Sequence, residues 1–290
     1  MISKRLQRAV LSAALTAMVM LSGQSSAFEL NLNALSDLVK NVDTAVSGIS
    51  EEKEIKLGKE VAASLLGAMP LVDNDELQKY LNTVGVWVAQ QSKRNNLDWR
   101  FALVDDAGVN AFAAPGGYIF VTRGLFSILN SEAELAGVLG HEIAHVVRKH
   151  HLDAMQSAAQ RQVAGDLLLT LADSDDREAM NALVSAGTKI YARGLDREDE
   201  IEADRIGVVY ATRAGYHPFS LLDVLTTIDS MAKDSEHLAF FTATHPPTGE
   251  RINILDQLMG SHFDTYADQP VVRERFVTAR EKLLAMYSAE

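Results

Sequence analysis

The sequence predicts an α+β protein that is mostly helical and carries one small β-sheet. Apolar residues recur every three or four positions in long stretches before residue 90 and after residue 131, as they do in amphipathic helices. Between these stretches, residues 99–122 contain short β-rich runs separated by turn residues. Hydrophobic residues make up 47% of the chain and charged residues 23%, which is an ordinary balance for a globular protein with a core.

The N-terminus is predicted to be a signal peptide that is cleaved after Ala27. Three basic residues between positions 4 and 8 precede an apolar stretch from Ala9 to Leu21, and small residues follow it. A membrane anchor is the alternative, but the stretch is shorter than the ~20 residues that a span needs, and no later apolar run is long enough. We therefore expect a chain that is secreted through the inner membrane into the periplasm.

The acidic balance of the chain limits its partners. Without residues 1–27, the chain has 24 basic against 39 acidic residues, a net charge of −15. Such a surface argues against nucleic acid or anionic lipid as a partner. The sequence has no cysteine, so disulfides and thiolate metal sites are excluded. Any metal must therefore be held by histidines and carboxylates.

The elements before the sheet are predicted to be helices. Apolar spacing predicts one helix from Asn31 to Ile49 and a second from Ser50 to Leu66, which Ser50 can cap. A third helix starts at Asp73 and carries four apolar residues at helical spacing between positions 77 and 88.

Three short strands are predicted next, at Trp99–Val104, Val109–Ala113 and Tyr118–Thr122, with turns that contain glycine or proline between them. The middle run, from Asn110 to Ala114, is short and ends at a proline. These features suit a strand at the edge of a sheet.

Helices are predicted again after residue 131. Ser131 and Glu134 form a capping box for a helix that runs to about His151. Asp196 can cap another helix, which ends near Gly215. The other predicted helices cover Asp153–Leu171, Ser174–Tyr191 and residues 219–232, 248–260 and 270–288. We expect one domain over residues 28–260, with a helical extension over residues 261–290 that packs on or near it.

The motif His141-Glu142-Ile143-Ala144-His145 lies on the helix that Ser131 begins. Residues four apart share one face of a helix, so both imidazoles can reach one metal ion. Glu142 would lie beside the metal without binding it, where a general base for a water molecule belongs. The pattern arises by chance in about one such sequence per hundred. Here it lies on a capped, apolar helix, where these three polar groups would be costly to bury without a metal.

A third ligand is expected downstream, because catalytic zinc keeps three protein ligands and one open position. Glu200 and Asp204 are four apart on the next strong helix. Glu200 would bind the metal, and Asp204 would accept the free ring N–H of a ligand histidine. Glu198 or Glu202 stays open as the ligand, and a solvated acidic face is the alternative to a metal site. Small residues beside Asp204, among them Gly207, favour the metal site because they allow close approach to the first helix.

Three segments together, His141–His145, Glu200–Asp204 and Asn110–Gly117, resemble the CAAX-prenyl-protease-type zinc metallopeptidases, and within them the soluble periplasmic, BepA-like branch. The likeness covers about Ser50 to Gly260. It implies a zincin-type metallopeptidase domain, a gluzincin core with added helices, whose edge strand borders the active-site cleft. It also implies that the glutamate four residues before the aspartate is the third zinc ligand, which supports Glu200, and that the setting is envelope protein quality control.

A last segment that resembles this family runs from Thr244 to Arg251. The tetrahedral intermediate of peptide hydrolysis carries an oxyanion, and His245 and Arg251 are the donors expected to stabilise it together with the metal. Alternatively, His245 forms only a hydrogen bond within a loop and Arg251 pairs with a surface acid. A sharper hypothesis is that His245 occupies the fourth metal position at rest and keeps the protease latent. His150 and His151 fall at the C-terminal end of their predicted helix, where positive charge suits the helix dipole, and we assign them no role.

The predicted activity is peptide-bond hydrolysis by a zinc endopeptidase with one Zn²⁺ per chain, held by His141, His145 and Glu200. Glu142 would take a proton from the attacking water and pass it to the leaving amine. One alternative is a non-catalytic or latent periplasmic chaperone-like protein with a zinc site. Another is a protein whose zinc is structural, with His245 as the fourth ligand.

The expected substrate is an unfolded polypeptide that adds as a strand to the sheet edge. The residues expected to contact it are Asn110, Ala111, Phe112 and Ala113. Because this mode reads backbone more than side chains, we predict weak sequence specificity and a preference for unfolded chains. Residues 152–195 are expected to form a lid over the cleft.

Overall fold

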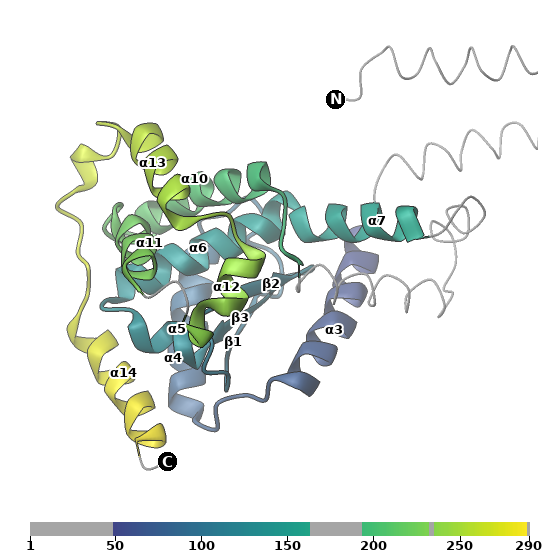
Figure 1. Cartoon of the computed structure of the whole chain (residues 1–290), viewed down its shortest axis with the longest axis horizontal. Coiled ribbons are helices and arrows are strands. Elements are labelled where there is room, and N and C mark those ends of the chain that lie inside the picture. The colour runs from purple at the N-terminus through teal and green to yellow at the C-terminus, as the bar shows by residue number, and fades with distance from the viewer. Residues whose placement is uncertain (1–48, 163–192, 232–234, 289–290) are drawn as a thin grey trace, which may run out of the picture. The chain divides into compact units, whose positions relative to one another are not determined.

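The structure is a computed structural model, and it describes residues 49–162, 193–231 and 235–288 of the chain (Figure 1). The predicted signal peptide and the predicted helix over residues 174–191 lie outside the described residues. So do all but the last residue of the predicted helix 31–49 and most of the expected lid over residues 152–195. Within the described part, no helix combines the length and the apolar character that crossing a membrane requires.

The described chain is mostly helical with one three-stranded sheet, which confirms the predicted α+β class. In chain order the elements are α3 (Glu51–Ala68), α4 (Asp75–Ala89), β1 (Arg100–Val104), β2 (Ala111–Ala114), β3 (Tyr118–Thr122), α5 (Arg123–Ile128), α6 (Glu132–Arg148), α7 (His150–Gln162), α10 (Arg197–Arg213), α11 (Ser220–Ser230), η1 (Glu236–Leu238), α12 (Ala239–Thr244), α13 (Thr248–Met259), η2 (Asp264–Tyr266) and α14 (Glu274–Tyr287). The central helix is α6, which packs against α4, α10, α11 and β2 (Figure 1).

The sheet has the strand order β1-β3-β2. Strands β1 and β3 are parallel, whereas β2 and β3 are antiparallel, with Phe112 opposite Phe120. The rings of these two phenylalanines stack with their centroids 5.1 Å apart. The predicted middle strand is β2, and among the described strands it lies at an edge of the sheet, as predicted. All four of its residues are buried, and its contact with α6 places it beside the motif helix.

The start of α6 follows the prediction in one half of the capping box. The Ser131 hydroxyl oxygen accepts a hydrogen bond from the Glu134 backbone N–H at 3.1 Å. The other half differs, because the Glu134 carboxylate accepts a hydrogen bond from the backbone N–H of Asn130 at 2.8 Å and not from that of Ser131. Both bonds satisfy backbone donors where the chain enters the helix.

The end of α6 was predicted wrongly. The helix expected to run to about His151 ends at Arg148. Lys149 takes a left-handed conformation with φ of 63°, and α7 begins at once with His150. A left-handed residue after a helix is usually glycine or asparagine, and the absence of either here concealed the break. His150 and His151 therefore begin a new helix.

Three other helix starts test the capping predictions. Ser50 caps α3 as predicted, since its hydroxyl oxygen accepts a hydrogen bond from the Lys53 backbone N–H at 3.3 Å. The helix expected from Asp73 begins slightly later, with Asn74 as its cap. Asp196 occupies the capping position of α10 as predicted, yet its side chain makes no capping hydrogen bond.

Helices α6 and α10 approach closely through two glycines. A Cβ atom at Gly207 would lie 2.6 Å from the backbone nitrogen of His141, and one at Gly140 would lie 2.6 Å from the Gly207 carbonyl oxygen. Any side chain at either position would push the helices apart. The small residues beside Asp204 predicted this approach, which brings the acidic face of α10 against the histidine face of α6.

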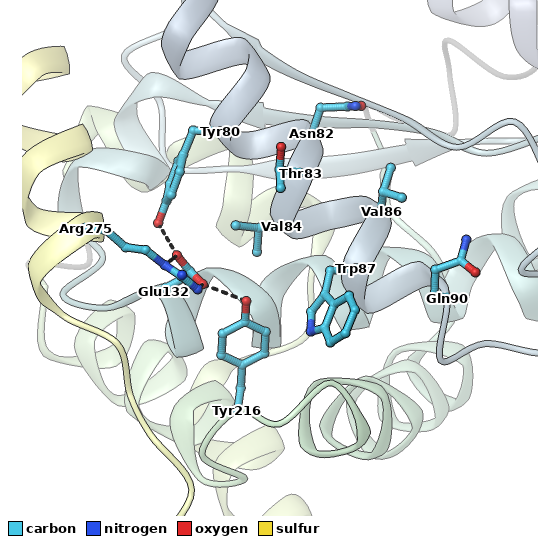
Figure 2. Close-up of a pocket in the computed structure, with 10 residues that line it drawn as sticks. All are labelled: Tyr80, Asn82, Thr83, Val84, Val86, Trp87, Gln90, Glu132, Tyr216 and Arg275. Carbon is cyan, nitrogen blue, oxygen red and sulfur yellow. Dashed lines mark hydrogen bonds and ion pairs between the residues drawn. The ribbon is translucent and has the colours of Figure 1, made fainter.

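Glu132, the first residue of α6, connects four parts of the fold (Figure 2). Its buried carboxylate accepts hydrogen bonds from the hydroxyls of Tyr80 on α4, at 2.8 Å, and Tyr216 after α10, at 2.7 Å. Arg275 on α14 donates to both carboxylate oxygens. A pocket of about 630 Å³ opens beside this group, with Trp87 on its wall. We call these four hydrogen-bonded side chains the Glu132 cluster, and it holds the start of the motif helix in place.

Candidate metal centre and active site

The two motif histidines converge because they lie four residues apart on α6. Their Nε2 atoms are 3.0 Å apart, and both side chains are buried. The residues of α6 are buried from its first residue to Val146, so the helix is fixed on all sides and the imidazoles have little freedom to turn away. Two ring nitrogens therefore face one point inside the protein.

Glu200 on α10 approaches the same point. Its Oε2 lies 3.7 Å from His141 Nε2, and its Oε1 lies 3.5 Å from His145 Nε2. The other two glutamates considered as ligands point elsewhere. Glu198 is 81% exposed, and Glu202 accepts a hydrogen bond from Arg148 at 2.9 Å.

These three side chains fit a metal ion. Zinc binds imidazole nitrogen and carboxylate oxygen at about 2.0–2.2 Å, which puts tetrahedral ligand atoms about 3.3 Å apart. The two histidine nitrogens are 3.0 Å apart, and each has one of the two Glu200 oxygens at a similar distance, 3.7 Å for His141 and 3.5 Å for His145. Glu200 Oε2 is also a buried oxygen with no hydrogen-bond partner in the described part of the chain. Burying such an oxygen without a donor or a cation is costly, so the donor set itself indicates a cation.

Asp204 lies behind His141. Its Oδ1 is 2.8 Å from His141 Nδ1, close enough to accept a hydrogen bond from the ring N–H. In that tautomer the lone pair of His141 is on Nε2, where it can bind the metal. Arg251 holds the same carboxylate by two hydrogen bonds, from Nε at 2.8 Å and from Nη2 at 2.6 Å. Burial alone would raise the pKa of Asp204, but the charges and hydrogen bonds of Arg251 and His141 outweigh it and hold that pKa well below its usual range.

Glu142 lies at a cavity next to the candidate metal site formed by His141, His145 and Glu200. It lines two small cavities, and Ala111 of β2 and His245 line both of them as well. Burial raises the pKa of Glu142 to about 7, although the charge of His141 opposes this shift. A carboxylate with that pKa can accept and release a proton near neutral pH.

His245 approaches from the opposite side. Its ring stacks on Phe241 with centroids 4.5 Å apart, and its Nδ1 lies 3.3 Å from the Phe241 carbonyl oxygen. Its Nε2 lies 3.8 Å from Glu200 Oε2, and atoms of His141, Glu200 and His245 lie within 4.8 Å of one another as a possible metal-binding group. Burial and the nearby charge of Arg251 lower the pKa of His245 well below its usual range, so the imidazole is neutral.

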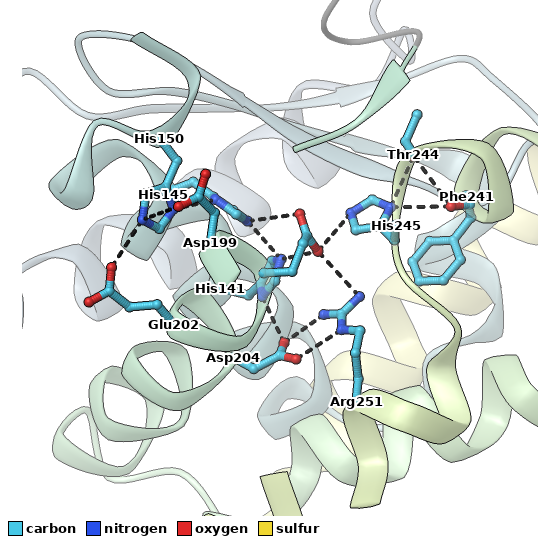
Figure 3. Close-up of polar contacts among 11 residues, drawn as sticks. His141, His145, His150, Asp199, Glu202, Asp204, Phe241, Thr244, His245 and Arg251 are labelled. Carbon is cyan, nitrogen blue, oxygen red and sulfur yellow. Dashed lines mark hydrogen bonds and ion pairs between the residues drawn. The ribbon is translucent and has the colours of Figure 1, made fainter. Parts of the chain in front are cut away.

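Two histidines at the site were missed by sequence reasoning. His150 Nδ1 lies 2.9 Å from His145 Nδ1 (Figure 3). The ring of His151 lies 5.4 Å from that of His145. His151 also lines the cavity that Glu142 faces. The reason is the break at Lys149, which turns both residues back over the end of α6. Only the close spacing of these histidines to the motif could have suggested them.

The fold and the site together define a class of protein. A buried α6 helix with the sequence His141-Glu142-Ile143-Ala144-His145 faces an acidic residue from a second helix and lies beside an edge strand. This is the arrangement of a metalloprotease, in which the glutamate of the motif serves as the base.

Comparison with known proteins identifies the family. Residues 75–259 match peptidase family M48. Because this match covers more than half of the chain, the protein belongs to peptidase family M48, a family of zinc metallopeptidases. The resemblance inferred from the sequence is thereby confirmed.

Several curated relatives carry names that agree with this class. The beta-barrel assembly-enhancing protease of Escherichia coli (strain K12) is 27% identical over 96% of this chain and 57% of its own length. A putative beta-barrel assembly-enhancing protease of Vibrio cholerae is 28% identical over 72% of this chain and 44% of its own. The mitochondrial metalloendopeptidase OMA1 of Arabidopsis thaliana is 28% identical over 76% and 42%. The chain thus spans about half the length of these relatives.

Proposed function

We propose that the protein is a zinc-dependent endopeptidase in which His141, His145 and Glu200 hold one Zn²⁺. The observation that carries this proposal is the convergence of two buried imidazoles and an under-bonded carboxylate on one point, with Glu142 at the adjoining cavity. Three protein ligands leave one position open, as catalytic zinc requires and structural zinc does not.

The residues of this chain divide the catalytic work. A zinc ion held here would polarise the scissile carbonyl and make water more acidic. Glu142 accepts the proton of the attacking water and delivers it to the leaving amine, and its burial, which raises its pKa, favours its role as the base. Asp204 keeps His141 in the tautomer that presents Nε2, and Arg251 fixes Asp204.

His245 is proposed to have two uses. Its neutral imidazole presents Nε2 near Glu200, so at rest it can complete the metal site and keep the enzyme latent. When substrate displaces it, the neutral tautomer with its proton on Nε2 can donate to the developing oxyanion, while Nδ1 lies 3.0 Å from the Thr244 hydroxyl. Arg251 has its Nη1 3.6 Å from Glu200 Oε2, where its charge supports either state. Latency alone predicts that replacing His245 by alanine raises basal cleavage, whereas the oxyanion role alone predicts a loss of activity.

The proposed substrate is an unfolded polypeptide that lies along β2. Ala111 and Phe112 line a cavity together with Glu142, so a chain extended along Asn110–Ala113 would pass the proposed base. The predicted signal peptide and the names of the bacterial relatives support a periplasmic setting, with misassembled envelope proteins as substrates. Residues 152–195 remain a proposed lid.

The test is zinc content and cleavage of casein by the mature chain, compared with Glu142→Gln. We expect one zinc in both and cleavage only with Glu142. Glu198→Gln is the matched control, because the same substitution at an 81% exposed side chain should change neither zinc content nor cleavage. Equal cleavage by Glu142→Gln would overturn the peptidase mechanism. Zinc in both proteins with no cleavage by either, and none after His245→Ala, would favour the chaperone-like alternative.

A further inference from the structure

The break between α6 and α7 places a third histidine against a proposed metal ligand. Lys149 turns the chain so that His150 folds back over the last turn of α6. The Nδ1 atoms of His145 and His150 are then 2.9 Å apart, with the rings inclined at 73°. His150 is buried, so water does not compete freely for this contact.

The far side of the His150 ring meets α10. Its Nε2 lies 3.1 Å from Glu202 Oε2, and Arg148 Nε donates to the same oxygen at 2.9 Å. Asp199 lies further off, with its Oδ1 3.7 Å from His150 Nε2. A continuous path of polar contacts therefore runs from Glu202 through His150 to His145, as Figure 3 shows.

With one proton on each ring, hydrogen-bond chemistry allows one set of ring-proton positions along this path. An ionised carboxylate only accepts, so the Nε2 of His150 carries a proton and donates it to Glu202. The Nδ1 of His150 is then an acceptor, and His145 donates to it from its own Nδ1. This leaves the lone pair of His145 on Nε2, the atom that faces His141 and Glu200.

We propose that His150 and Glu202 are positioning residues that hold His145 in the tautomer able to bind the metal. The proposal rests on the proposed function, because it takes His145 to be a ligand. On this proposal, each motif histidine is held by an acidic residue of α10, and an arginine holds that acidic residue in turn. Asp204 supports His141 directly and is held by Arg251, whereas Glu202 supports His145 through His150 and is held by Arg148.

The experiment measures zinc affinity by competition with a chelator at neutral pH. His150→Phe keeps a ring but removes the acceptor, and we expect it to weaken zinc binding by about 10- to 100-fold, as loss of such support does elsewhere. His150→Gln should recover part of this loss, because its amide oxygen can accept the proton of His145. His262→Phe, at an exposed position, is the matched control and should bind zinc like the wild type.

Glu202→Gln is a second variant, which tests the same path while His150 and its packing stay unchanged. We expect it to weaken zinc binding less than His150→Phe does, since its amide oxygen still accepts a hydrogen bond. In the double variant, the Glu202 substitution should add almost nothing to His150→Phe, because the two residues act in one chain. With Co²⁺ in place of zinc, His150→Phe should also shift the visible absorption bands, which a merely structural role would leave unchanged.

The outcomes separate this inference from the proposed function. If the wild type binds zinc and His145→Ala loses it, the ligand assignment stands. Wild-type affinity and unshifted cobalt bands in His150→Phe would then overturn the positioning role alone. If the wild type binds no zinc, or His145→Ala binds it as tightly as the wild type, the proposed function and this inference both fall.

Discussion

Two buried glutamates lie against α6 in very different surroundings. Glu132, at the start of the helix, receives hydrogen bonds from two tyrosine hydroxyls and from Arg275 on both oxygens. Glu200, beside the motif, has histidine and arginine nitrogens no nearer than 3.5 Å and one oxygen without a partner in the described chain. Although burial acts against the charge of both, donors lower the pKa of Glu132, whereas burial prevails and raises that of Glu200.

The difference shows how to tell a structural carboxylate from one kept for a ligand. A carboxylate whose neighbours donate hydrogen bonds to both oxygens has its hydrogen-bonding capacity satisfied, and it serves to hold helices together. A buried carboxylate that faces imidazole lone pairs at metal-ligand distances lacks such donors, and its charge is balanced only when a cation binds. The pocket of about 630 Å³ beside Glu132 is by this measure a less convincing site than the small cavities at Glu142, because its charged groups already satisfy one another.

The same substitution at the two glutamates should therefore give opposite results, and this is the largest effect expected. Glu200→Gln should weaken zinc binding by more than about 100-fold, because it replaces a ligand itself and not only a group that supports one. Glu132→Gln should keep its zinc but lower the free energy of unfolding by about 2 kcal/mol, the usual scale for hydrogen bonds to a charged group. Zinc content by metal analysis and urea unfolding measure the two quantities. Loss of zinc in Glu132→Gln would break the distinction.

A smaller effect is expected at the contact that brings Glu200 to the histidines. Gly207→Ala should lower the free energy of unfolding by about 1–3 kcal/mol, because the new Cβ meets the His141 backbone. It should also weaken zinc binding, since α10 carries Glu200 away from α6. Gly67→Ala is the matched control, because open space surrounds that position on α3 and alanine favours a helix. Unchanged zinc binding in Gly207→Ala would show that the close approach does not position the ligand.

The smallest expected effect is a pH dependence that belongs to Glu132. Its pKa in the folded protein is lowered, so its ionised form stabilises the fold. That contribution is complete above the unfolded pKa, which is near 4.3 for a glutamate, and is lost as the pH falls through the folded pKa. The difference in unfolding free energy between wild type and Glu132→Gln should be constant from pH 7 to 5 and shrink below about pH 4. A difference that grows on acidification would contradict the assigned charge state.

Local sequence features predicted much of the fold. Ser50 and Ser131 begin their helices as predicted, and β2 lies at the edge of the described sheet, as its proline indicated. Such features depend on neighbours within a few positions, which a sequence displays directly. The break at Lys149 was missed because a lysine rarely takes a left-handed conformation and no glycine or proline marks it.

The site likewise has features that local spacing predicted and features that it could not predict. The spacing of His141 and His145, and that of Glu200 and Asp204, is local, and the structure brings the two pairs into contact. The role of each residue stays a prediction. The contact of His150 with His145 depends on the helix break, and the Glu132 cluster joins side chains from four separate parts of the chain. Neither arrangement leaves a local pattern, so neither could be predicted.

The contact between Gly140 and Gly207 has a consequence for the biosynthesis of the protein. During synthesis the motif leaves the ribosome well before α10 exists, so the nascent chain offers only two of the three proposed ligands. A complete ion-binding set arises only when the two glycines meet. Maturation should therefore end with metal uptake, after folding and not before it, and a chelator added during refolding should leave a folded but inactive protein that zinc restores.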